Sequence, residues 1–504
     1  KREYFSVPDN DKMIVASLKD AEQPIMLVNL YMKRDAAPDT EKNTLKYQRD
    51  AYLDDLVSYI VGERLNEVQE SPSKPCLSAS AHIGQFLVSR SKEAFTLSFG
   101  ARQENIRGSF EAAVGCIEQI RQHGFTQSEL DRAKAFYLKV VNNRFNQRDD
   151  RRNNYFVRKA QNNFLNNEPI TTEAYDKQLA ERFDREVTLK DVNAAMREAI
   201  TNRNQVLVVY APEKADFHIP SDAELESYVL EAQARKYPAY EEKKVDTKLI
   251  EKLPNKGRIV SQKAFAHGTT ELTLSNGVKV YFKPTDFNKD QVTLRFFGEG
   301  GSSLYPDADI PNIQFLATAI KEGGLGKFDK LALNKYLSDK TVRINANVGA
   351  ETQSISGQSS VKDVKTLFEL AHLYFTDLRR DDQAFGSELN RMRSFLTNRE
   401  ASPKVGYNDS LSAIVYGNSP RTQPVKAATI DKVNYDRVLQ IYHERFSNAS
   451  NFKLIVMGNI SLETLRPLLE QYIASLPSTG KKETFADTYP NVRNCNETHR
   501  WTKK

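Results

Sequence analysis

One short pattern occurs twice in this chain, and the repetition limits the folds that it can adopt. VTLKDVN begins at Val187 and is echoed by ATIDKVN, which begins at Ala428, a shift of 241 residues. Upstream, SELDR from Ser128 is echoed by SELNR from Ser387. The repeating unit of a solenoid is roughly 20–50 residues. A shift as long as this one therefore predicts two copies of a whole domain.

Length and charge narrow the class of protein further. A single hydrophobic core stops growing at roughly 250–300 residues, so a chain of 504 residues is expected to form two domains. The 72 basic and 66 acidic residues nearly balance, at a net charge of +6, which favours neither nucleic acid nor a membrane surface as partner. No stretch approaches the 18 apolar residues of a membrane span. Because the chain opens at Lys1 without an apolar signal region, we expect it to be a piece of a longer protein.

A charged, proline-punctuated segment, 212–264, separates two regions of mixed strand and helix patterns. A capping box predicts one helix within it, from Asp222 to Ala234. The segment is too long for an ordinary connection inside a domain, so we expect it to be an interdomain linker. The first domain would then span 1–211 and the second 265–504.

Strand and helix patterns in both regions indicate an α+β fold. Phe95, Leu97 and Phe99 alternate as in a half-buried strand. In the second region, Asn276-Gly277 lies between two strand-like runs, which is a strong hairpin signal. We expect two homologous domains, each with an antiparallel-rich mixed sheet and helices packed mainly on one face.

The segment from Asn142 to Glu168 admits two interpretations. It is crowded with Asn and Arg around Phe145, Tyr155, Phe156 and Phe164. One interpretation is single-stranded nucleic-acid binding, in which cations follow the phosphates and rings stack on bases. The other is a long helix whose aromatic face is core. Because the rings recur at helical intervals and acidic residues dilute the positive field, we expect the helix and no nucleic acid.

The cysteines do not indicate a metal or redox site. A zinc ribbon or a Cys-x-x-Cys motif needs two cysteines separated by two residues. No pair among Cys76, Cys116 and Cys495 has that spacing, so neither motif is present. Cys116 lies in an apolar helical pattern and is expected to be a small buried residue.

The seven histidines are also widely separated, and none has another within ten residues. A hydrolytic zinc site usually needs two imidazoles one helical turn apart. We expect His372 to be a hydrogen-bonded core residue, His443 to lie on a helix surface and His82 to lie at a strand or loop edge. The sequence has no G-x-S-x-G or G-x-x-x-x-G-K-[ST] motif. We therefore expect no catalytic, cofactor-binding or metal-binding residue in this chain.

Several motifs together resemble the pitrilysin/insulinase-type zinc metallopeptidase family, and the resemblance covers almost the whole chain. The second region carries LSNGVKVYFKP from Leu274, VTLRFFGEGGSS from Val292, PNIQFLATAIKEGG from Pro311 and a closing pattern from Tyr442 to Pro477. The first region resembles the family's second domain through RLNE at Arg64–Glu67 and GFTQSELDRAK from Gly124.

The resemblance also implies where zinc chemistry should be and shows that it is missing. In catalytic members the helix after the Gly-rich turn carries His-x-x-Glu-His, whose two imidazoles hold zinc while the Glu takes a proton from the bound water. The matching positions here are Gln314, Ala317 and Thr318. The third ligand position falls near Phe395, where no carboxylate stands, and Glu388 lies one to two turns earlier and would be alone. The second domain therefore resembles a degenerate copy of the catalytic domain.

The family's plan implies a function for such a segment. Long members have four homologous domains, of which the first carries zinc, arranged as two half-shells joined by a linker around a closed chamber. The chain would be the second and third domains of a long bacterial member, inactive alone, contributing chamber wall and hinge to a zinc metalloendopeptidase. The expected partners are peptide substrates and the parent's other domains, and the expected location is the periplasm or cell envelope. The alternatives are a wholly non-catalytic scaffold homologue and a nucleic-acid-binding protein that uses 142–168.

Overall fold

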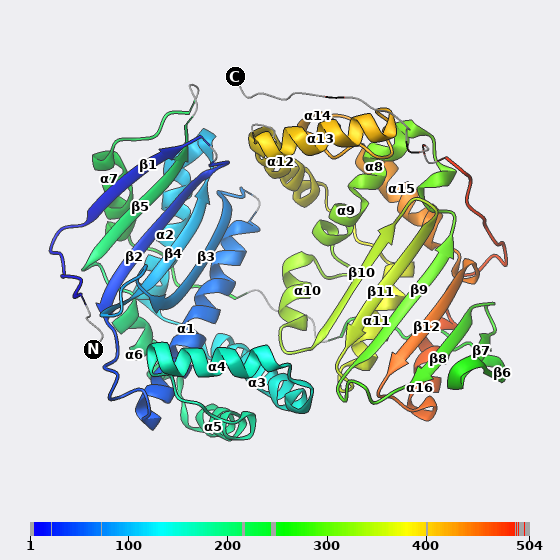
Figure 1. The fold of residues 1–504 in the computed structure, drawn as a ribbon, viewed down its shortest axis with the longest axis horizontal. Coiled ribbons are helices and arrows are strands. Elements are labelled where there is room, and N and C mark those ends of the chain that lie inside the picture. The colour runs from blue at the N-terminus through cyan, green and yellow to red at the C-terminus, as the bar shows by residue number, and fades with distance from the viewer. Residues whose placement is uncertain are drawn as a thin grey trace. The chain divides into compact units, whose positions relative to one another are not determined.

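The structure, a computed structural model, places the chain in two compact units. It describes residues 5–21, 23–71, 73–213, 217–242, 248–399, 402–488, 490, 492 and 498. Unit 1 is Lys1–Lys244 and unit 2 is Val245–Lys504 (Figure 1). Each unit contains one mixed sheet that carries helices, so the predicted α+β class is confirmed.

Unit 1 has a five-stranded sheet in the order β1-β5-β2-β4-β3. Its strands are β1 (Ile14–Asp20), β2 (Met26–Asp35), β3 (Cys76–Gln85), β4 (Lys92–Ala101) and β5 (Gln205–Pro212). Its helices are α1 (Leu45–Gln69), α2 (Ile106–His123), α3 (Gln127–Asn146), α4 (Asn153–Asn166), α5 (Glu173–Glu186), α6 (Leu189–Ala199) and α7 (Asp222–Ala234). β1 and β5 run parallel, and the other neighbours are antiparallel.

Unit 2 has a seven-stranded sheet in the order β10-β11-β9-β12-β8-β7-β6. Its strands are β6 (Ile259–Phe265), β7 (Thr269–Leu274), β8 (Lys279–Pro284), β9 (Val292–Glu299), β10 (Val342–Val348), β11 (Thr352–Ser359) and β12 (Phe452–Gly458). Its α-helices are α8 (Ile310–Gln314), α9 (Leu316–Gly323), α10 (Lys330–Leu337), α11 (Val364–Thr376), α12 (Asp382–Arg399), α13 (Pro403–Tyr416), α14 (Ala427–Ile430), α15 (Tyr435–Phe446) and α16 (Leu462–Leu468). β8 and β12 run parallel, and β7 and β8 form the predicted hairpin.

The two sheets match strand for strand. Reading from β3, the order β3-β4-β2-β5-β1 in unit 1 corresponds to β10-β11-β9-β12-β8 in unit 2, with the parallel pair at the same place. The repeated patterns fall on equivalent elements. SELDR lies in α3 and SELNR in α12, while VTLKDVN precedes β5 and ATIDKVN precedes β12. Unit 2 extends the shared plan by β7 and β6. The common topology agrees with the duplication that the repeats predict.

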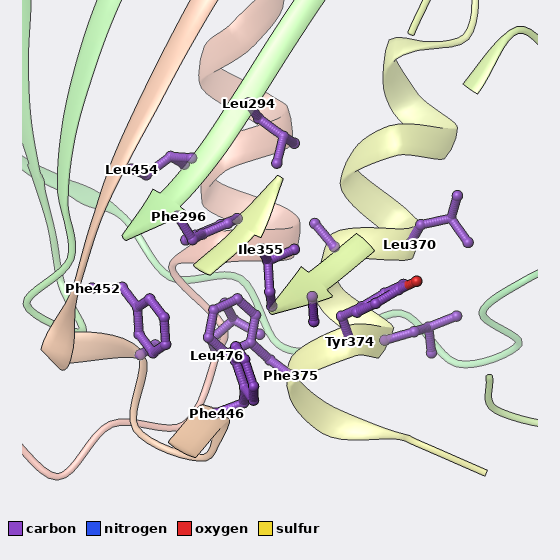
Figure 2. Packing of buried hydrophobic residues seen from close by; sticks show 14 of the residues in the cluster. Leu294, Phe296, Ile355, Leu370, Tyr374, Phe375, Phe446, Phe452, Leu454 and Leu476 are labelled. Atoms are coloured by element: carbon purple, nitrogen blue, oxygen red, sulfur yellow. The ribbon is translucent and has the colours of Figure 1, made fainter. Parts of the chain in front are cut away.

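The core of unit 2 lies between its sheet and the helices on one face. Alternate residues of β12 are buried and exposed, as a strand with one covered face requires. On the covered face, the rings of Phe296 and Phe375 meet edge to face at 5.0 Å, and those of Phe375 and Phe452 at 5.2 Å (Figure 2). Such aromatic pairs add about 0.5–1.5 kcal/mol to the effect of area burial.

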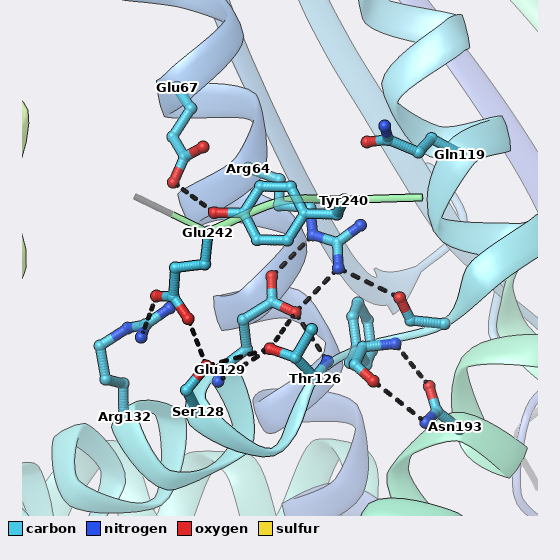
Figure 3. A network of polar contacts seen from close by, with 12 residues as sticks. Arg64, Glu67, Gln119, Thr126, Ser128, Glu129, Arg132, Asn193, Tyr240 and Glu242 are labelled. Atoms are coloured by element: carbon cyan, nitrogen blue, oxygen red, sulfur yellow. Dashed lines mark hydrogen bonds and ion pairs between the residues drawn. The ribbon is translucent and has the colours of Figure 1, made fainter. Parts of the chain in front are cut away.

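A buried ion pair connects helices of unit 1 (Figure 3). Arg64 on α1 binds Glu129 on α3 through two hydrogen bonds, of 2.6 and 2.8 Å. The same carboxylate caps its own helix by accepting from the amide of Thr126 at 2.8 Å. The ring of Tyr240 lies 4.1 Å from the guanidinium, and its hydroxyl donates to Glu67 at 2.8 Å. The segment that follows α7 is thereby fastened to unit 1.

Most of the segment predicted as a linker packs onto one unit or the other. Helix α7 has the predicted bounds, and its Leu225 and Val229 belong to the unit 1 core. Leu249 belongs to the unit 2 core, and β6 pairs with β7. The division into units falls between Lys244 and Val245, inside the predicted 212–264. Sequence patterns did not reveal β6, because nearly all of its residues are exposed.

The prediction of one long helix with an aromatic core face over Asn142–Glu168 is wrong. The helix α3 ends at Asn146, a short 3-10 turn follows, and α4 is a separate helix with no buried residue. Phe156 and Phe164 are 55% and 73% exposed.

Among the described residues, none of the helices has the length and apolar character that a bilayer crossing needs.

Candidate functional site

The Gly-rich turn of unit 2 joins β9 to the helix pair α8 and α9. Gly300 and Gly301 have positive φ angles of 125° and 57°. A Cβ at Gly301 would lie 2.5 Å from the amide nitrogen of Thr352, so a side chain cannot be accommodated there. Beyond the turn, the buried side chain of Asn312 accepts from the amide of Asn434 at 2.8 Å. The order of strand, glycine turn and helix that the resemblance implies is therefore present.

The three motif positions lie on two short helices rather than on one. The helix α8 ends at Gln314, Phe315 leaves helical geometry at φ −99° and ψ 3°, and α9 begins at Leu316. The side-chain Nε2 of Gln314 donates to the backbone carbonyl of Gln423 at 3.3 Å. Ala317 is exposed on α9. The one helix that the resemblance implies after the Gly-rich turn is therefore interrupted within the motif positions.

Glu388, the carboxylate one to two turns before the third ligand position, forms an ion pair with an arginine. Phe395, at that position, is 48% exposed on α12. Glu388 is buried and receives two hydrogen bonds from the guanidinium of Arg391, one of them 2.7 Å long. Glu129, at the equivalent place in unit 1, is paired with Arg64. In both units this glutamate forms an ion pair with an arginine.

The surroundings of the motif positions also disfavour a cation. Arg421 borders the same hollow as Gln314 and Ala317, and its side chain is only 6% exposed. Its guanidinium donates to the carbonyls of Ser302 and Tyr305, and it forms an ion pair of 2.8 Å with Asp307. A second positive charge beside a buried guanidinium is unfavourable.

An amide, a methyl group and a hydroxyl do not make a zinc site, so these residues do not fit the metal. In the described part of the chain, no group of three or more His, Cys, Asp or Glu side chains could hold a metal ion.

None of the histidines in the described ranges lines the hollow beside Gln314 and Ala317. His372 on α11 is buried, and its Nδ1 lies 2.8 Å from the carbonyl oxygen of Tyr472, as expected for a core histidine. Burial lowers the pKa of His372, which keeps the ring neutral near pH 7. His443 is exposed on α15, as predicted, and His82 is exposed on β3. His499 lies outside the described residues.

The described cysteines are structural. Cys116 is buried in the unit 1 core, as predicted, and burial raises the pKa of its thiol to about 12. Cys76 is likewise buried, on β3. Cys495 lies outside the described residues.

Two cavities lie along β10, the strand at one end of the unit 2 sheet. The larger, of ≈400 Å³, is open to solvent on one side and is lined by residues of α9, α10, α11 and β10. The smaller, of ≈230 Å³, reaches from α8 to the last residues of β10 and the turn that follows. Ala317 lines both cavities. The side chain at the position matched to the motif's Glu therefore borders a hollow that runs beside a sheet edge.

The backbone register shows which groups of β10 face that hollow. The carbonyl of Thr341 accepts from the amide of Ser360, and the amide of Gly349 donates to the carbonyl of Thr352. Hydrogen bonds to β11 alternate along an antiparallel strand, so odd-numbered residues bond to β11. The residues that turn their backbone amides and carbonyls to the open side are Val342, Ile344, Ala346 and Val348.

The open side of β10 is suited to receive another strand. In the described part of the chain, the hydrogen-bonding partner found there is the hydroxyl of Tyr374, which donates to the carbonyl of Ile344 at 3.1 Å. An extended peptide can pair with such an edge through its backbone and place side chains in the adjoining pocket. The larger cavity has an apolar floor, its charged lining residues are Lys321, Lys330 and Arg343, and no acidic residue lines it.

Sequence comparison finds relatives among zinc proteases. They include "Zinc protease PQQL-like" of Arabidopsis thaliana, 21% identical over 94% of this chain and 44% of the relative. "Probable zinc protease PqqL" of Haemophilus influenzae is 22% identical over 96% of this chain and 51% of the relative, and that of Escherichia coli K12 is 20% identical over 75% and 40%. The chain thus spans about half the length of these relatives. A family profile described as "Peptidase M16 inactive domain" matches residues 432–503.

One solved structure shares the fold. The ferredoxin protease FusC, solved as a mutant in complex with Arabidopsis ferredoxin, superposes with a TM-score of 0.60 at 14% identity over 98% of this chain and 54% of that chain. The periplasmic protease PqqL of Escherichia coli gives a TM-score of 0.45 at 17% identity over 97% and 54%.

The duplicated α+β units, with a glycine turn and a helix pair at the site, define the peptidase-type architecture that the sequence patterns resemble. The chain is a homologue of the pitrilysin/insulinase-type (M16) zinc proteases, and it is PqqL-like.

Proposed function

We propose that this chain is a non-catalytic segment of a zinc metalloprotease, equivalent to the second and third domains of a four-domain member. The observation that supports this most directly is the exchange of all three motif positions to Gln314, Ala317 and Thr318 in a unit that keeps the peptidase-type fold. Zinc and the hydrolytic step would belong to another part of a longer parent protein. The zinc-protease relatives are about twice as long as this chain, which is consistent with that division.

The segment's own contribution would be to form chamber wall and hinge and to hold peptide. The open side of β10 offers backbone groups for an added strand, with the cavities beside it for side chains. The uncovered face of the unit 2 sheet presents Ile455 and Met457, which are 40% and 45% exposed, near the cations Lys453 and Arg295. Apolar and basic groups side by side suit unfolded segments that carry apolar and acidic side chains.

The parent protein is expected to cleave peptides in a zinc-dependent way. The measurement is cleavage of a quenched fluorescent peptide by the full-length parent, with and without a chelator, followed by addition of zinc. Loss of activity with chelator and recovery with zinc would support the proposal. Absent cleavage, or cleavage that the chelator leaves unchanged, would instead support a scaffold homologue that keeps the fold without catalysis.

The isolated chain is expected to bind no zinc stoichiometrically and to cleave no peptide. Structural zinc sites bind with apparent free energies of about 10–16 kcal/mol, which calorimetry detects readily. The titration would use chain that has first been treated with chelator, so that metal carried through purification is removed. A tight one-to-one site would show that protein ligands converge somewhere in the chain, and the assignment of the motif positions would be wrong.

The proposed location is the periplasm or cell envelope of a bacterium. The support is the sequence relation to PqqL of Escherichia coli, whose structure is described as that of a periplasmic protease. Fractionation of cells that make the tagged parent tests it, and recovery in the cytoplasmic fraction would contradict it.

A further inference from the structure

The helix α4 is amphipathic in the reverse of the usual sense, because its inner face is polar. Tyr155, Lys159 and Asn163 recur four residues apart and are the half-buried positions of the helix. Tyr155 donates to Glu173, Lys159 lies 3.3 Å from the same carboxylate, and Asn163 donates to the carbonyl of Glu168 at 2.8 Å. These polar contacts attach α4 to the segment that follows it and to the first residue of α5.

The outer face of α4 carries the apolar side chains. Phe156, Ala160 and Phe164 are four residues apart, and Val157 and Leu165 lie beside them, so all five fall on one side of the helix. All five are exposed. An ordinary surface helix turns such a stripe toward the core. Outward rings on a stripe of this kind indicate a surface that receives a partner.

Positive charge is concentrated in the part of the sequence that contains α4. Between Lys139 and Asn167 the chain has seven basic and two acidic residues, a net charge of +5, against +6 for all 504 residues. A partner that matches this segment must therefore carry negative charge as well as apolar groups.

The duplicated unit presents exposed apolar groups at the equivalent helix. In unit 2, α13 follows α12 as α4 follows α3, and α13 likewise has no buried residue. Tyr407 and Leu411, four residues apart on it, are exposed. Its charged residues are Lys404 and Asp409, which cancel, whereas α4 carries Arg158 and Lys159 and no acidic residue, so of the two helices α4 has the positive charge.

We infer that the outer face of α4 binds extended peptide segments that combine aromatic or aliphatic side chains with acidic ones. The exposed amides of Asn154, Gln161 and Asn162 lie among the rings and cations. Amide groups of this kind hydrogen-bond to peptide backbone, and rings, amides and arginines together are the chemistry of peptide-binding surfaces such as antibody loops. This inference rests on the proposed function in one respect, since it takes peptides to be what the parent handles.

The same features fit a membrane or a nucleic acid less well. Burying the exposed amides in hydrocarbon without partners is costly, and an interfacial helix has a continuous apolar face. Phe156 and Phe164 are eight residues apart, about 12 Å along the helix, which is too far for adjacent stacked bases. Arg148 and Arg151 already lie over the rings of Phe145 and Tyr155, at 4.2 and 4.7 Å, rather than along a phosphate path.

The test is peptide binding by the whole 504-residue chain. A fluorescein-labelled peptide containing Phe and Glu would be titrated by anisotropy against wild type and against the double variant Phe156→Ser/Phe164→Ser. We expect the double variant to bind at least about tenfold more weakly, because exposed rings at the centre of a contact carry much of its energy. A peptide with Lys in place of Glu should bind wild type more weakly than the Glu peptide.

The matched control is Phe287→Ser, since Phe287 is 90% exposed on a loop of unit 2. It should leave the affinity unchanged, and all three replaced rings are exposed, so circular dichroism should show intact folds. Equal binding by wild type and double variant would overturn the inference, as would equal binding of the Glu and Lys peptides. Loss of binding only to phosphatidylglycerol vesicles or to oligouridine RNA in the double variant would assign the surface to membrane or nucleic acid instead.

The outcome can be separated from that of the proposed function. Peptide binding is measured on this chain without zinc, whereas the proposed function is decided by chelator-sensitive cleavage in the parent. Binding without any cleavage in the parent would leave the α4 surface standing and remove the protease assignment. Chelator-sensitive cleavage by the parent, together with unchanged peptide binding by the α4 double variant, would support the protease assignment and overturn the inference about α4.

Discussion

Replacing Glu129 by alanine is expected to destabilise unit 1 by about 3–5 kcal/mol, because the substitution breaks a buried ion pair. The side chains of Arg64 and Glu129 are 2% and 3% exposed and form two hydrogen bonds. Removing the carboxylate leaves a buried guanidinium uncompensated. It also removes the acceptor that caps α3 at Thr126. The measurement is hydrogen exchange of the amides of α1 and α3, which reports on unit 1 separately.

The control for this change is Glu104→Ala. Glu104 also pairs with an arginine, Arg102, but its side chain is 60% exposed, so the expected loss is below about 1 kcal/mol. Replacing both partners, as Arg64→Met with Glu129→Leu, should recover much of the loss, because no buried charge is then left alone. A loss in Glu129→Ala no larger than that in Glu104→Ala would mean that the ion pair does not hold unit 1 together.

Replacing Ile344 by proline is expected to weaken strand capture at β10 by about five- to tenfold. Ile344 turns its amide to the open side, and proline has no amide hydrogen to donate there. Proline is tolerated on an edge strand when its nitrogen faces away from the neighbour, so pairing with β11 should persist. One net hydrogen bond of about 1 kcal/mol accounts for most of the effect. The measurement is anisotropy of a labelled extended peptide rich in Val and Thr, titrated with the whole chain.

Ile344→Val is the matched variant for that experiment. It keeps the outward amide and a strand-forming side chain, so peptide affinity should change by less than about twofold. If proline and valine have the same effect, the peptide does not add to β10. If Phe156→Ser/Phe164→Ser weakens this peptide and the proline does not, α4 is the main binding surface.

Much of the fold could be predicted from local signals in the sequence. The hairpin at Asn276-Gly277 and the bounds of α7 follow from turn and cap chemistry, which depends on neighbouring residues alone. The duplication could be predicted because its repeated patterns lie on equivalent elements. The edge strand β6 could not, since an exposed strand lacks the alternation that reveals one buried face. The expected division into 1–211, 212–264 and 265–504 stays a prediction.

The segment around α4 shows why periodicity alone can mislead. Helical spacing of the rings predicted that one face would be buried, and the spacing is real, but the face points outward. The inward positions are Tyr155, Lys159 and Asn163, whose polar contacts with Glu168 and Glu173 cannot be read from hydrophobicity.

The candidate site was predictable only in part. The residues at the three motif positions, Gln314, Ala317 and Thr318, can be read from the sequence once the glycine turn is matched to the family. The position of β10 at the end of the sheet, with cavities beside it, could not be predicted. It depends on the order of the strands, which the pattern of a single strand does not encode.

The last strand of each unit lies inside its sheet rather than at an end. β5 lies between β1 and β2, and β12 lies between β8 and β9, although each is made long after its neighbours. On the ribosome, β1 and β2 therefore lack the strand between them until residues 205–212 have left the exit tunnel. The same holds for β8 and β9 until residues 452–458 have left it. The sheet of each unit can be completed only after its last strand has been made. A chain that stops short of β5 or β12 would therefore expose two unpaired strand edges at once and be prone to aggregate.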